Sequence, residues 1–475
     1  MITRPEPNTI TRHSKDFIGR LCEAPERHPG RTIVAIGLVF ALAYGASLVL
    51  MPKPDGRIVV GDAVHYYVYL RSVVFDGDLQ FHNEYVRLYG LTGRGPGVAW
   101  VYDPLPTGYI RNVMPVGPAI AWAPLYLIAT GVVALLRWCG VEYPLDGFGR
   151  VFQASAGFSG IAAATIGAWF AFRAAAVLFG ARAAIWSTLA IWLASSALYY
   201  SLVSPTYSHA SSMFANGAVV LMWLLTRDRS DIWRYAALGA LIGFAALVRW
   251  QEATLLALPV IDALRAAWRE PGGAGFRVRR AATRVVVAAL AGLVVFSPQI
   301  IVWKILYGQA FLIPQGGQFM RWHDAALMAV LFSDWHGLFT WTPVVALAIA
   351  GLVPLWRRDA HVATGVIVLL LVAWFTNAAV ADWWAGEAFG SRRFVSATPL
   401  FVIGLAALLA RWQSRPVIRV GVVAVVVALN LLLLFQYQLF LKGWRDIAPY
   451  PRGAYGLGVA RFVVPFHALG RWLGK

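Results

Sequence analysis

The chain has 475 residues, of which 59% are hydrophobic and 13% charged, about half the charged share of a soluble domain. With a mean hydropathy of +0.62, this composition excludes a string of water-soluble domains and places most of the chain in lipid. Lys and Arg exceed Asp and Glu by 41 to 23, and in a membrane protein that surplus is expected to mark cytoplasmic loops rather than a nucleic-acid partner.

The first apolar stretch, 33–50, follows a basic segment, 1–32, and shows no cleavage pattern, so we expect a retained membrane anchor. Later stretches long enough to span a bilayer lie at about 151–172, 183–203, 209–226, 233–248, 253–268, 285–303, 337–356, 361–380, 396–410 and 420–440. The stretch 253–268 is the weakest, because Pro259 and Asp262 interrupt it. Together they predict an all-α, polytopic bundle of about eleven transmembrane helices in a single domain, 1–475.

The apolar stretch 115–138 contains prolines, and its placement decides the side of every later loop. If it lies along the outer leaflet, the inside segments hold 22 of the 41 Lys and Arg, and the short outside loops after residue 200 hold five. If it spans, 16 of those 22 lie outside, including the basic run 265–284. The positive-inside rule therefore favours a surface-lying 115–138 with the N-terminus in the cytoplasm.

This topology places the loops 51–150, 304–336 and 381–395 outside, together with the tail 442–475. The first loop is expected to carry juxtamembrane amphipathic helices. The tail spaces apolar residues between arginines, which predicts an amphipathic helix lying in the interface. In a bacterium the outer side of this membrane is the periplasm.

Titratable side chains gather at the predicted outer helix ends, whereas the span centres are almost free of them. They are Asp62, His65, Glu84, Asp103, His209, Arg249, Glu252, Asp334, His336, Asp382, Glu387, Arg392 and Arg393. A transporter would be expected to bury carboxylates or broken helices at mid-membrane. The distribution therefore favours an enzyme that acts on a lipid-borne substrate at the outer boundary.

The first loop carries the sharpest motif, Gly61-Asp62-Ala63-Val64-His65. On a helix that begins there, Asp62 and His65 share one face. The alternative is that Asp62 only caps the helix. The run Asp76-Gly77-Asp78 is more typical of a turn than of a ligand set.

These features resemble the GT-C superfamily of integral-membrane glycosyltransferases, in which a carboxylate follows the first transmembrane helix and two membrane-parallel helices come next. The motifs that carry the resemblance are Gly61-Asp62-x-x-His65-Tyr66, Ser204-Pro205-x-x-Ser208-His209, Leu247-Val248-Arg249, the block from Leu331-Phe332-Ser333-Asp334 to Trp341-Thr342-Pro343, and Trp384-x-Gly386-x-x-Phe389-Gly390-x-Arg392. In order and spacing they are similar to uncharacterised bacterial members, related to protein O-mannosyltransferases and the lipid A aminoarabinose transferase.

The resemblance implies that a bacterial inner-membrane enzyme transfers a sugar from a polyprenyl-phosphate donor to a lipid, glycan or protein acceptor on the periplasmic face. A sugar phosphoester has a competent leaving group, so an inverting displacement needs one general base and cations for the phosphate. Asp62 is the expected base, and Arg392 is the first choice for the phosphate because its planar fork suits it. The remaining candidates are Arg249 and Arg393 for the phosphate, and His65, His209 and Glu387 for substrate.

Other interpretations of these residues remain open. Ala63 stands where many relatives have a second acid, so binding of Mg²⁺ or Mn²⁺ through an acid pair is disfavoured, and we expect no metal ligands. Arg249 and Arg393 are also typical of snorkelling anchors, and His209 of a packed helix start. Asp334 and His336 are more typical of residues that order a loop. A flippase for lipid-linked glycans and a non-catalytic envelope scaffold are the alternative functions.

Overall fold

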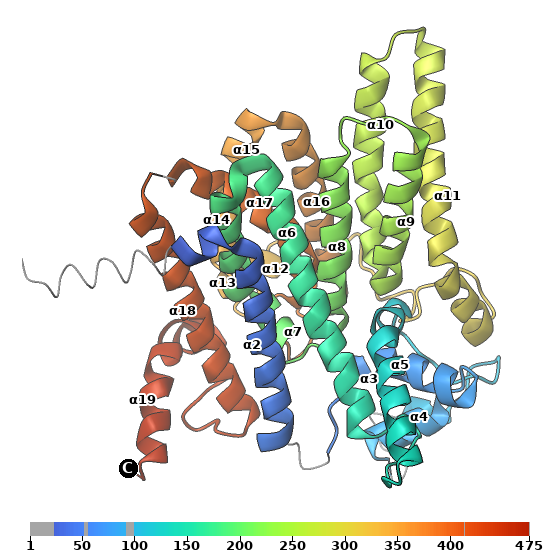
Figure 1. Cartoon of the computed structure of the whole chain (residues 1–475), viewed down its shortest axis with the longest axis vertical. Helices are drawn as coiled ribbons and strands as arrows, with labels where there is room; N and C mark the ends of the chain where they lie inside the picture. Colours follow the sequence, from blue (N-terminus) through green and yellow to red (C-terminus); the bar gives the residue numbers. More distant parts are fainter. Residues whose placement is uncertain (1–22, 52–55, 92–98, 413, 475) are drawn as a thin grey trace, which may run out of the picture.

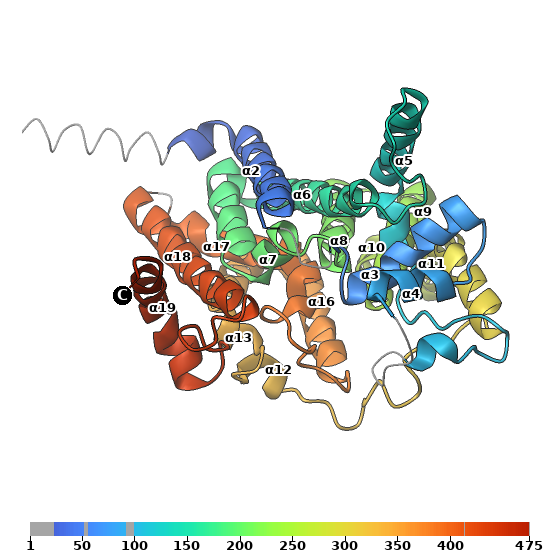
Figure 2. The ribbon, with the colours of Figure 1, turned by 90° about the horizontal axis from the view of Figure 1, so that it is seen from below.

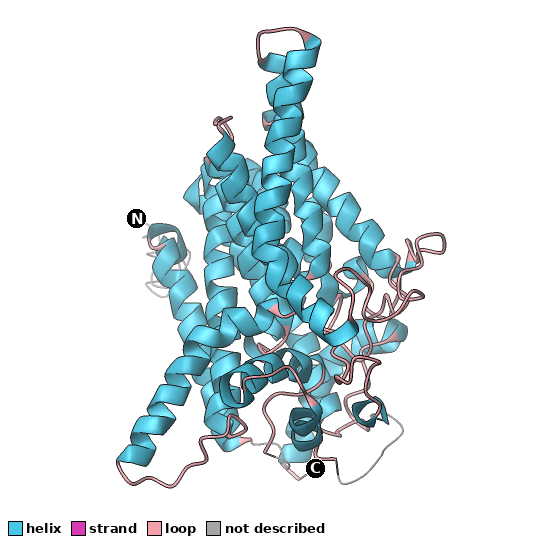
Figure 3. Ribbon diagram, turned by 90° about the vertical axis from the view of Figure 1, so that its right-hand side faces the viewer, coloured by secondary structure: helices cyan, strands magenta, loops and turns pink. Residues whose placement is uncertain are grey.

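The computed structural model describes residues 23–51, 56–91, 99–412 and 414–474, which form a helical molecule (Figure 1). Within these ranges the helices are joined by loops, and the one strand-like pairing is an isolated bridge between Met320 and Val380 (Figure 3). The predicted all-α class is confirmed. Of the predicted segments, 1–22 of the N-terminus and 52–55 and 92–98 of the first loop lie outside the described residues.

The longer helices form the body of the molecule. They are α2 (Pro29–Leu50), α5 (Gly117–Trp138), α6 (Arg150–Leu193), α8 (Ser208–Leu225), α9 (Ile232–Val248), α10 (Ala257–Arg269), α11 (Ala274–Tyr307), α16 (Ala360–Ala378), α17 (Thr398–Leu409) and α18 (Pro416–Leu441). Shorter segments are α3 (Asp62–Arg71), η1 (Ser72–Asp76), α4 (His82–Tyr89), η2 (Ala99–Tyr102), α7 (Ser196–Leu202), η3 (Trp250–Leu256), α12 (Ala329–Phe332), α13 (Leu338–Trp341), α14 (Val344–Ala350), α15 (Leu352–Arg358), η4 (Arg392–Ala397), η5 (Ala410–Trp412), η6 (Ala454–Val459) and α19 (Ala460–Trp472).

Seven helical segments of the described chain are long and apolar enough to cross a membrane. They are Pro29–Leu50, Gly117–Trp138, Arg150–Leu193, Ala274–Tyr307, Ala360–Ala378, Arg392–Trp412 and Pro416–Leu441. This number indicates a multi-pass membrane protein. The count of eleven spans stays a prediction, as does the placement of 115–138 along the surface, since α5 is itself among the seven.

The element α6 consists of two helical arms that meet at Gly180. This glycine has φ 80° and ψ 162°, which is not helical, and Figure 1 shows the chain turning back there. Both arms pack on α2: Phe158 of the first arm lies 5.4 Å from the ring of Tyr44, and Trp192 of the second lies 5.3 Å from Phe40. The predicted spans 151–172 and 183–203 therefore correspond to the two arms of one helical hairpin, although the second span continues beyond the end of α6.

Two predicted spans are interrupted for local reasons. The stretch 337–356 is not one helix, because Pro343 lacks an amide hydrogen and disfavours helical geometry at Thr342, whose φ is −132° and ψ 67°. The stretch 183–203 breaks at Ser195, which is extended and whose hydroxyl accepts from the Ala197 amide at 3.1 Å to cap α7.

Helices α9 and α11 approach each other closely through small residues. A Cβ at Gly239 would lie 2.0 Å from the carbonyl oxygen of Ala288, and one at Gly243 would lie 2.3 Å from that of Gly292. Small residues at such contacts let backbones pack tightly where the surrounding lipid supplies no hydrophobic drive. The close fit fixes α9, and with it Arg249 at its end.

The first loop folds into a small helical layer centred on Arg71. Its guanidinium is 2.9 Å from Glu84 of α4, and burial raises the pKa of Glu84 to about 7 despite this partner. Gly77, with φ 72°, ends η1, and the Asp78 carboxylate accepts from the Gln80 amide at 3.0 Å. The prediction that Asp76-Gly77-Asp78 forms a turn is confirmed.

The layer of α3, α4 and α5 lies at one end of the molecule, and the turn between α10 and α11 lies at the opposite end (Figure 1). That distant turn belongs to the basic run 265–284, which was predicted to be cytoplasmic. Viewed from the α3–α4 end, the tail helix α19 lies on the far side from α3 and α4 (Figure 2). The predicted helix in the tail is present, and it exposes Phe466 and Trp472.

Candidate active site

Asp62 and Arg392 form an ion pair in which Arg392 Nη1 lies 2.9 Å from Asp62 Oδ2. Asp62 is the first residue of α3, and Arg392 begins η4. The Arg392 guanidinium also lies over the ring of Tyr207, 5.6 Å from its centre. The structure therefore brings together the predicted base and the first-choice phosphate ligand from two distant parts of the chain.

Gly61 sets the start of α3. It is the N-cap residue, with φ 58°, so the interpretation of Asp62 as a cap is wrong. A Cβ at this position would lie 2.5 Å from the hydroxyl of Tyr207. Glycine is therefore needed for both its backbone conformation and its lack of a side chain. This close approach holds Tyr207 beside the Asp62–Arg392 pair.

Arg249 and His209 meet next to this pair. Arg249 caps the end of α9 and donates through Nη1 to Nδ1 of His209 at 2.6 Å, which assigns the ring proton of a neutral His209 to Nε2. His209 also packs against the rings of Tyr200 and Tyr207, at 4.5 and 6.2 Å. Both Arg249 and His209 are buried, so Arg249 does not have the exposed geometry of a snorkelling anchor.

Three polar contacts near this cluster were not assigned roles from the sequence. Glu252, which is buried, accepts from Asn216 at 2.7 Å and lies 3.9 Å from the Arg249 guanidinium. Tyr66 donates to the hydroxyl of Ser208 at 3.1 Å. The spacing Arg249-x-x-Glu252 at a helix end was a usable signal for the contact between those two side chains. The contact between Tyr66 and Ser208 links two segments that no spacing in the sequence relates.

His65 shares the α3 face with Asp62 but faces an aromatic cluster. Its Nδ1 lies 2.8 Å from the Tyr85 hydroxyl and its Nε2 lies 3.3 Å from that of Tyr89, while its ring stacks on Trp100 at 5.6 Å. Burial lowers the pKa of His65 to about 4. With both nitrogens engaged by tyrosines, His65 anchors α3 in the first-loop layer.

Arg393 and Glu387 form their hydrogen bonds with residues other than Asp62 and Arg392. Arg393 donates to the carboxylate of Asp382 at 2.8 Å and to its carbonyl at 2.7 Å. Glu387 has an exposed side chain, and its carbonyl accepts from Tyr437 at 3.2 Å. Their roles toward phosphate and substrate stay predictions.

The described residues form no group of three His, Cys, Asp or Glu that could share an ion. The neighbour of Asp62 is the guanidinium of Arg392, not a second acid. This donor set does not fit a divalent cation as it stands. The chemistry available at the site is that of the Asp62 carboxylate, two arginines and a neutral imidazole, with the Glu252 carboxylate beside Arg249.

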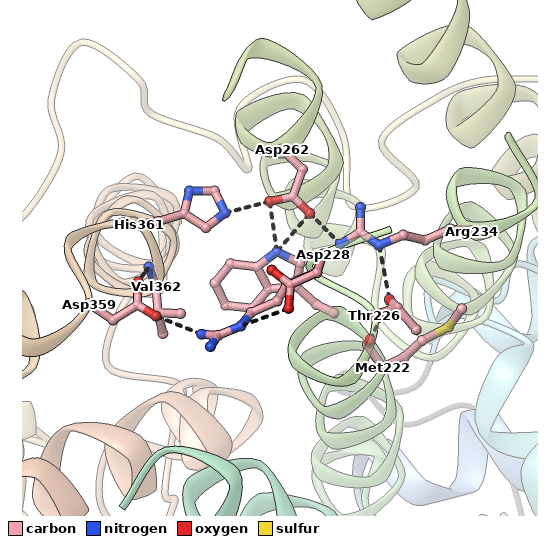
Figure 4. A network of polar contacts seen from close by, with 10 residues as sticks. Met222, Thr226, Asp228, Arg234, Asp262, Asp359, His361 and Val362 are labelled. Carbon is pink, nitrogen blue, oxygen red and sulfur yellow. Dashed lines mark hydrogen bonds and ion pairs between the residues drawn. The ribbon is translucent and has the colours of Figure 1, made fainter. Parts of the chain in front are cut away.

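A second buried network (Figure 4) lies away from this site, on the side of the bundle that faces the turn between α10 and α11 (Figure 1). Asp262 of α10 forms an ion pair with Arg234 of α9, accepts from His361 of α16 at 2.8 Å, and accepts from the Trp223 indole of α8 at 3.1 Å. Its centre is a buried carboxylate whose partners come from three other helices. The network therefore acts as a junction of the bundle.

Comparison with known proteins gave no match to a protein-family model and none to a curated protein. Among solved structures, the chain is similar to ArnT from Cupriavidus metallidurans bound to undecaprenyl phosphate, with a TM-score of 0.49 and 16% identity over 93% of this chain and 75% of that one. It is also similar to the oligosaccharyltransferase of Archaeoglobus fulgidus in complex with zinc and sulfate, with a TM-score of 0.42 and 13% identity over 90% of this chain. The match covers 53% of that archaeal chain, about half its length.

Proposed function

We propose that the chain transfers a sugar from a polyprenyl-phosphate donor to an envelope acceptor, with Asp62 as the general base and Arg392 as the main ligand of the donor phosphate. The observation that carries this proposal is the 2.9 Å contact between these two side chains. A base and a phosphate ligand must flank the same carbon atom for an inverting displacement. Residues assigned to those two roles from separate motifs are neighbours in the fold.

Asp62, Arg392 and Arg249 can account for the proton, the bonds and the charge of this transfer. Asp62 takes the proton of the acceptor hydroxyl, the acceptor oxygen forms a bond to C1 of the sugar, and the bond from C1 to the phosphate oxygen breaks with its electrons on the phosphate. Arg392 and Arg249 stabilise the charge of the departing polyprenyl phosphate. Before the donor binds, Arg392 pairs with Asp62. A phosphate that takes over the Arg392 fork frees the carboxylate to act as a base.

An apolar groove of about 780 Å³ offers room for a lipid chain. It lies between the end of α3, α5 and α11, and the side chains that line it include Leu70, Val73, Ile120, Leu127 and Ile301. Hydrocarbon surface of this kind suits a prenyl or acyl chain, which would leave water on binding there. The groove supports a lipid-borne substrate.

The function is tested by comparing the envelope glycans and lipids of a deletion strain with those of its parent by mass spectrometry. We expect loss of one sugar modification and accumulation of its polyprenyl-phosphate donor, both restored by the wild-type chain. Purified protein in proteoliposomes should transfer sugar from an extract of lipid-linked donors. A lipid-linked glycan trapped on the cytoplasmic face, with no transfer by the purified chain, would instead support a flippase.

The proposed orientation is testable with a native residue. Cys139, at the end of α5, is a free and exposed cysteine. In a Cys22→Ser background, a membrane-impermeant maleimide added outside spheroplasts is expected to label Cys139, because α5 would not cross the membrane. Labelling only after the membrane is opened would overturn the proposed topology, and the active-site assignment with it. A Cys139→Ser variant supplies the blank.

A further inference from the structure

Two residues in neighbouring loops have strained backbones. His336 and Ala385 are the non-glycine residues with positive φ in the described chain, at 66° and 61°. Such conformations cost about 1–3 kcal/mol each and persist where the surroundings enforce them. Asn, Asp and His are the non-glycine side chains found most often in this region, and the contacts of the His336 ring show what holds it there.

The His336 ring holds two separate segments at once. Nδ1 donates to the carbonyl oxygen of Trp384, next to the strained Ala385, and Nε2 lies 2.5 Å from the hydroxyl of Tyr450 in the tail. His336 is 2% exposed, and burial lowers its pKa to about 4. A neutral ring with its proton on Nδ1 leaves Nε2 to accept from Tyr450.

The tail reaches the same place through a second set of contacts. Asp334 accepts from the Gly453 amide at 3.0 Å, and the guanidinium of Arg452 lies 4.6 Å from the ring centre of Trp335. Gln436 of α18 donates to the carbonyls of Pro449 and Gly456 at 2.8 and 3.0 Å, which folds the tail back on α18. The interpretation of Asp334 and His336 as residues that order a loop is confirmed, and the segment they order includes the tail.

The turn at Trp384, which His336 joins to Tyr450, leads directly along the chain to Arg392, the proposed phosphate ligand. From Trp384 the chain passes Gly386 and Gly390, both with positive φ, and reaches Arg392. Arg392 is close enough to His336 for its charge to help lower the pKa of the imidazole. Phe389 is held separately, by its stack on Tyr199 at 5.2 Å. Loss of the bond between His336 and Tyr450 is therefore expected to loosen 384–388 without unfolding the whole loop, because Tyr437 still donates to the Glu387 carbonyl at 3.2 Å.

We propose that His336 is a positioning residue that joins the tail, through Tyr450, to the Trp384 turn and so fixes the place of Arg392. This inference rests on the proposed function only for the role given to Arg392. It assigns the C-terminal segment 444–453 to the active-site framework, although none of its residues belongs to the Asp62 cluster.

The test removes the His336–Tyr450 bond from each side. Tyr450→Phe deletes the hydroxyl, and His336→Asn keeps a residue type suited to positive φ and an amide that can reach Trp384 but not Tyr450. We expect each variant to lose about ten- to a hundredfold in turnover, the scale of loss for a displacement of about 1 Å. The double variant should lose little more than Tyr450→Phe alone, because that variant already removes the bond to His336 and also the 3.4 Å contact of the hydroxyl with the Ala388 carbonyl. Tyr455→Phe is the matched control, since Tyr455 is an exposed tyrosine of the same tail.

A second measurement does not depend on turnover. Spin labels at Glu387→Cys, on the exposed loop, and at Val294→Cys, an exposed position of α11 outside the apolar groove, report their distance distribution in a background that lacks Cys22 and Cys139. A narrow distribution should broaden in Tyr450→Phe and stay narrow in Tyr455→Phe. If the wild type transfers no sugar, this broadening still supports the bond between His336 and Tyr450 while the proposed function fails. An unchanged distribution, or broadening with full turnover in an active protein, overturns the positioning role of His336.

Discussion

Asp62→Asn is expected to lower sugar transfer by about 10²–10⁴-fold, the usual contribution of a general base, while the protein still folds and inserts. Asparagine has the same shape but does not accept the acceptor's proton. The ion pair that it loses is partly exposed, with side chains 32% and 15% accessible, so its loss should cost at most about 1 kcal/mol of stability. The change in activation free energy, about 2.7–5.5 kcal/mol, is therefore much larger than the change in stability.

Two further variants test whether the loss of activity is specific to Asp62 and separate the role of the base from that of the phosphate ligand. Asp103→Asn alters an exposed acid of the same first loop and should leave turnover unchanged. Arg392→Gln should raise the KM for the donor as well as lower kcat, because Arg392 is proposed to contact the phosphate in both the bound donor and the transition state. Steady-state kinetics with a lipid-linked donor series measures both quantities. Near-normal turnover of Asp62→Asn would remove Asp62 as the base and leave its pairing with Arg392 a structural contact.

The sequence predicted residues at this site better than it predicted their contacts. Asp62, Arg392, Arg249 and His209 were selected because charged groups at helix ends are costly unless they are used, and the structure places all four in one cluster. The pairing of Asp62 with Arg392 could not be read from spacing, because it depends on how the whole bundle brings the first residues of α3 and η4 together. Arg393, adjacent to Arg392, was given the same role, yet the turn of η4 directs it to Asp382.

Helix limits were predictable where apolar runs were uninterrupted. The predictions failed where a single residue breaks the helical backbone. The runs that became α8, α9 and α16 contain no such residue, and their observed limits lie within two residues of the predicted ones. Pro343 and Ser195 were visible in the sequence. A hydropathy average over a whole span hides the helix break that each of them causes. The strain at His336 was beyond prediction, because the tail contacts that enforce it are tertiary.

Asp262→Ala is expected to be the most destabilising single change outside the active site, at about 3–5 kcal/mol. It would leave Arg234, which is 2% exposed, as an unpaired buried charge, and would remove the acceptor of His361 and Trp223. The partners of this carboxylate come from α8, α9 and α16 (Figure 4), so its loss loosens α10 against these three helices. Thermal unfolding of the purified protein in detergent, followed by intrinsic fluorescence, measures the shift in Tm.

The neighbouring pair Arg227–Asp359 provides the comparison. Its atoms are 2.6 Å apart, but its side chains are 31% and 23% accessible, so Arg227→Ala should cost no more than about 1 kcal/mol. Replacing both buried partners, as in Arg234→Met with Asp262→Leu, should restore much of the loss, since the penalty comes from the unpaired charge rather than from the missing pair. Protein that stays folded should keep its turnover in all these variants, because the network does not touch the Asp62 cluster. A selective loss of turnover in folded Asp262→Ala would show instead that this junction controls the active site across the bundle.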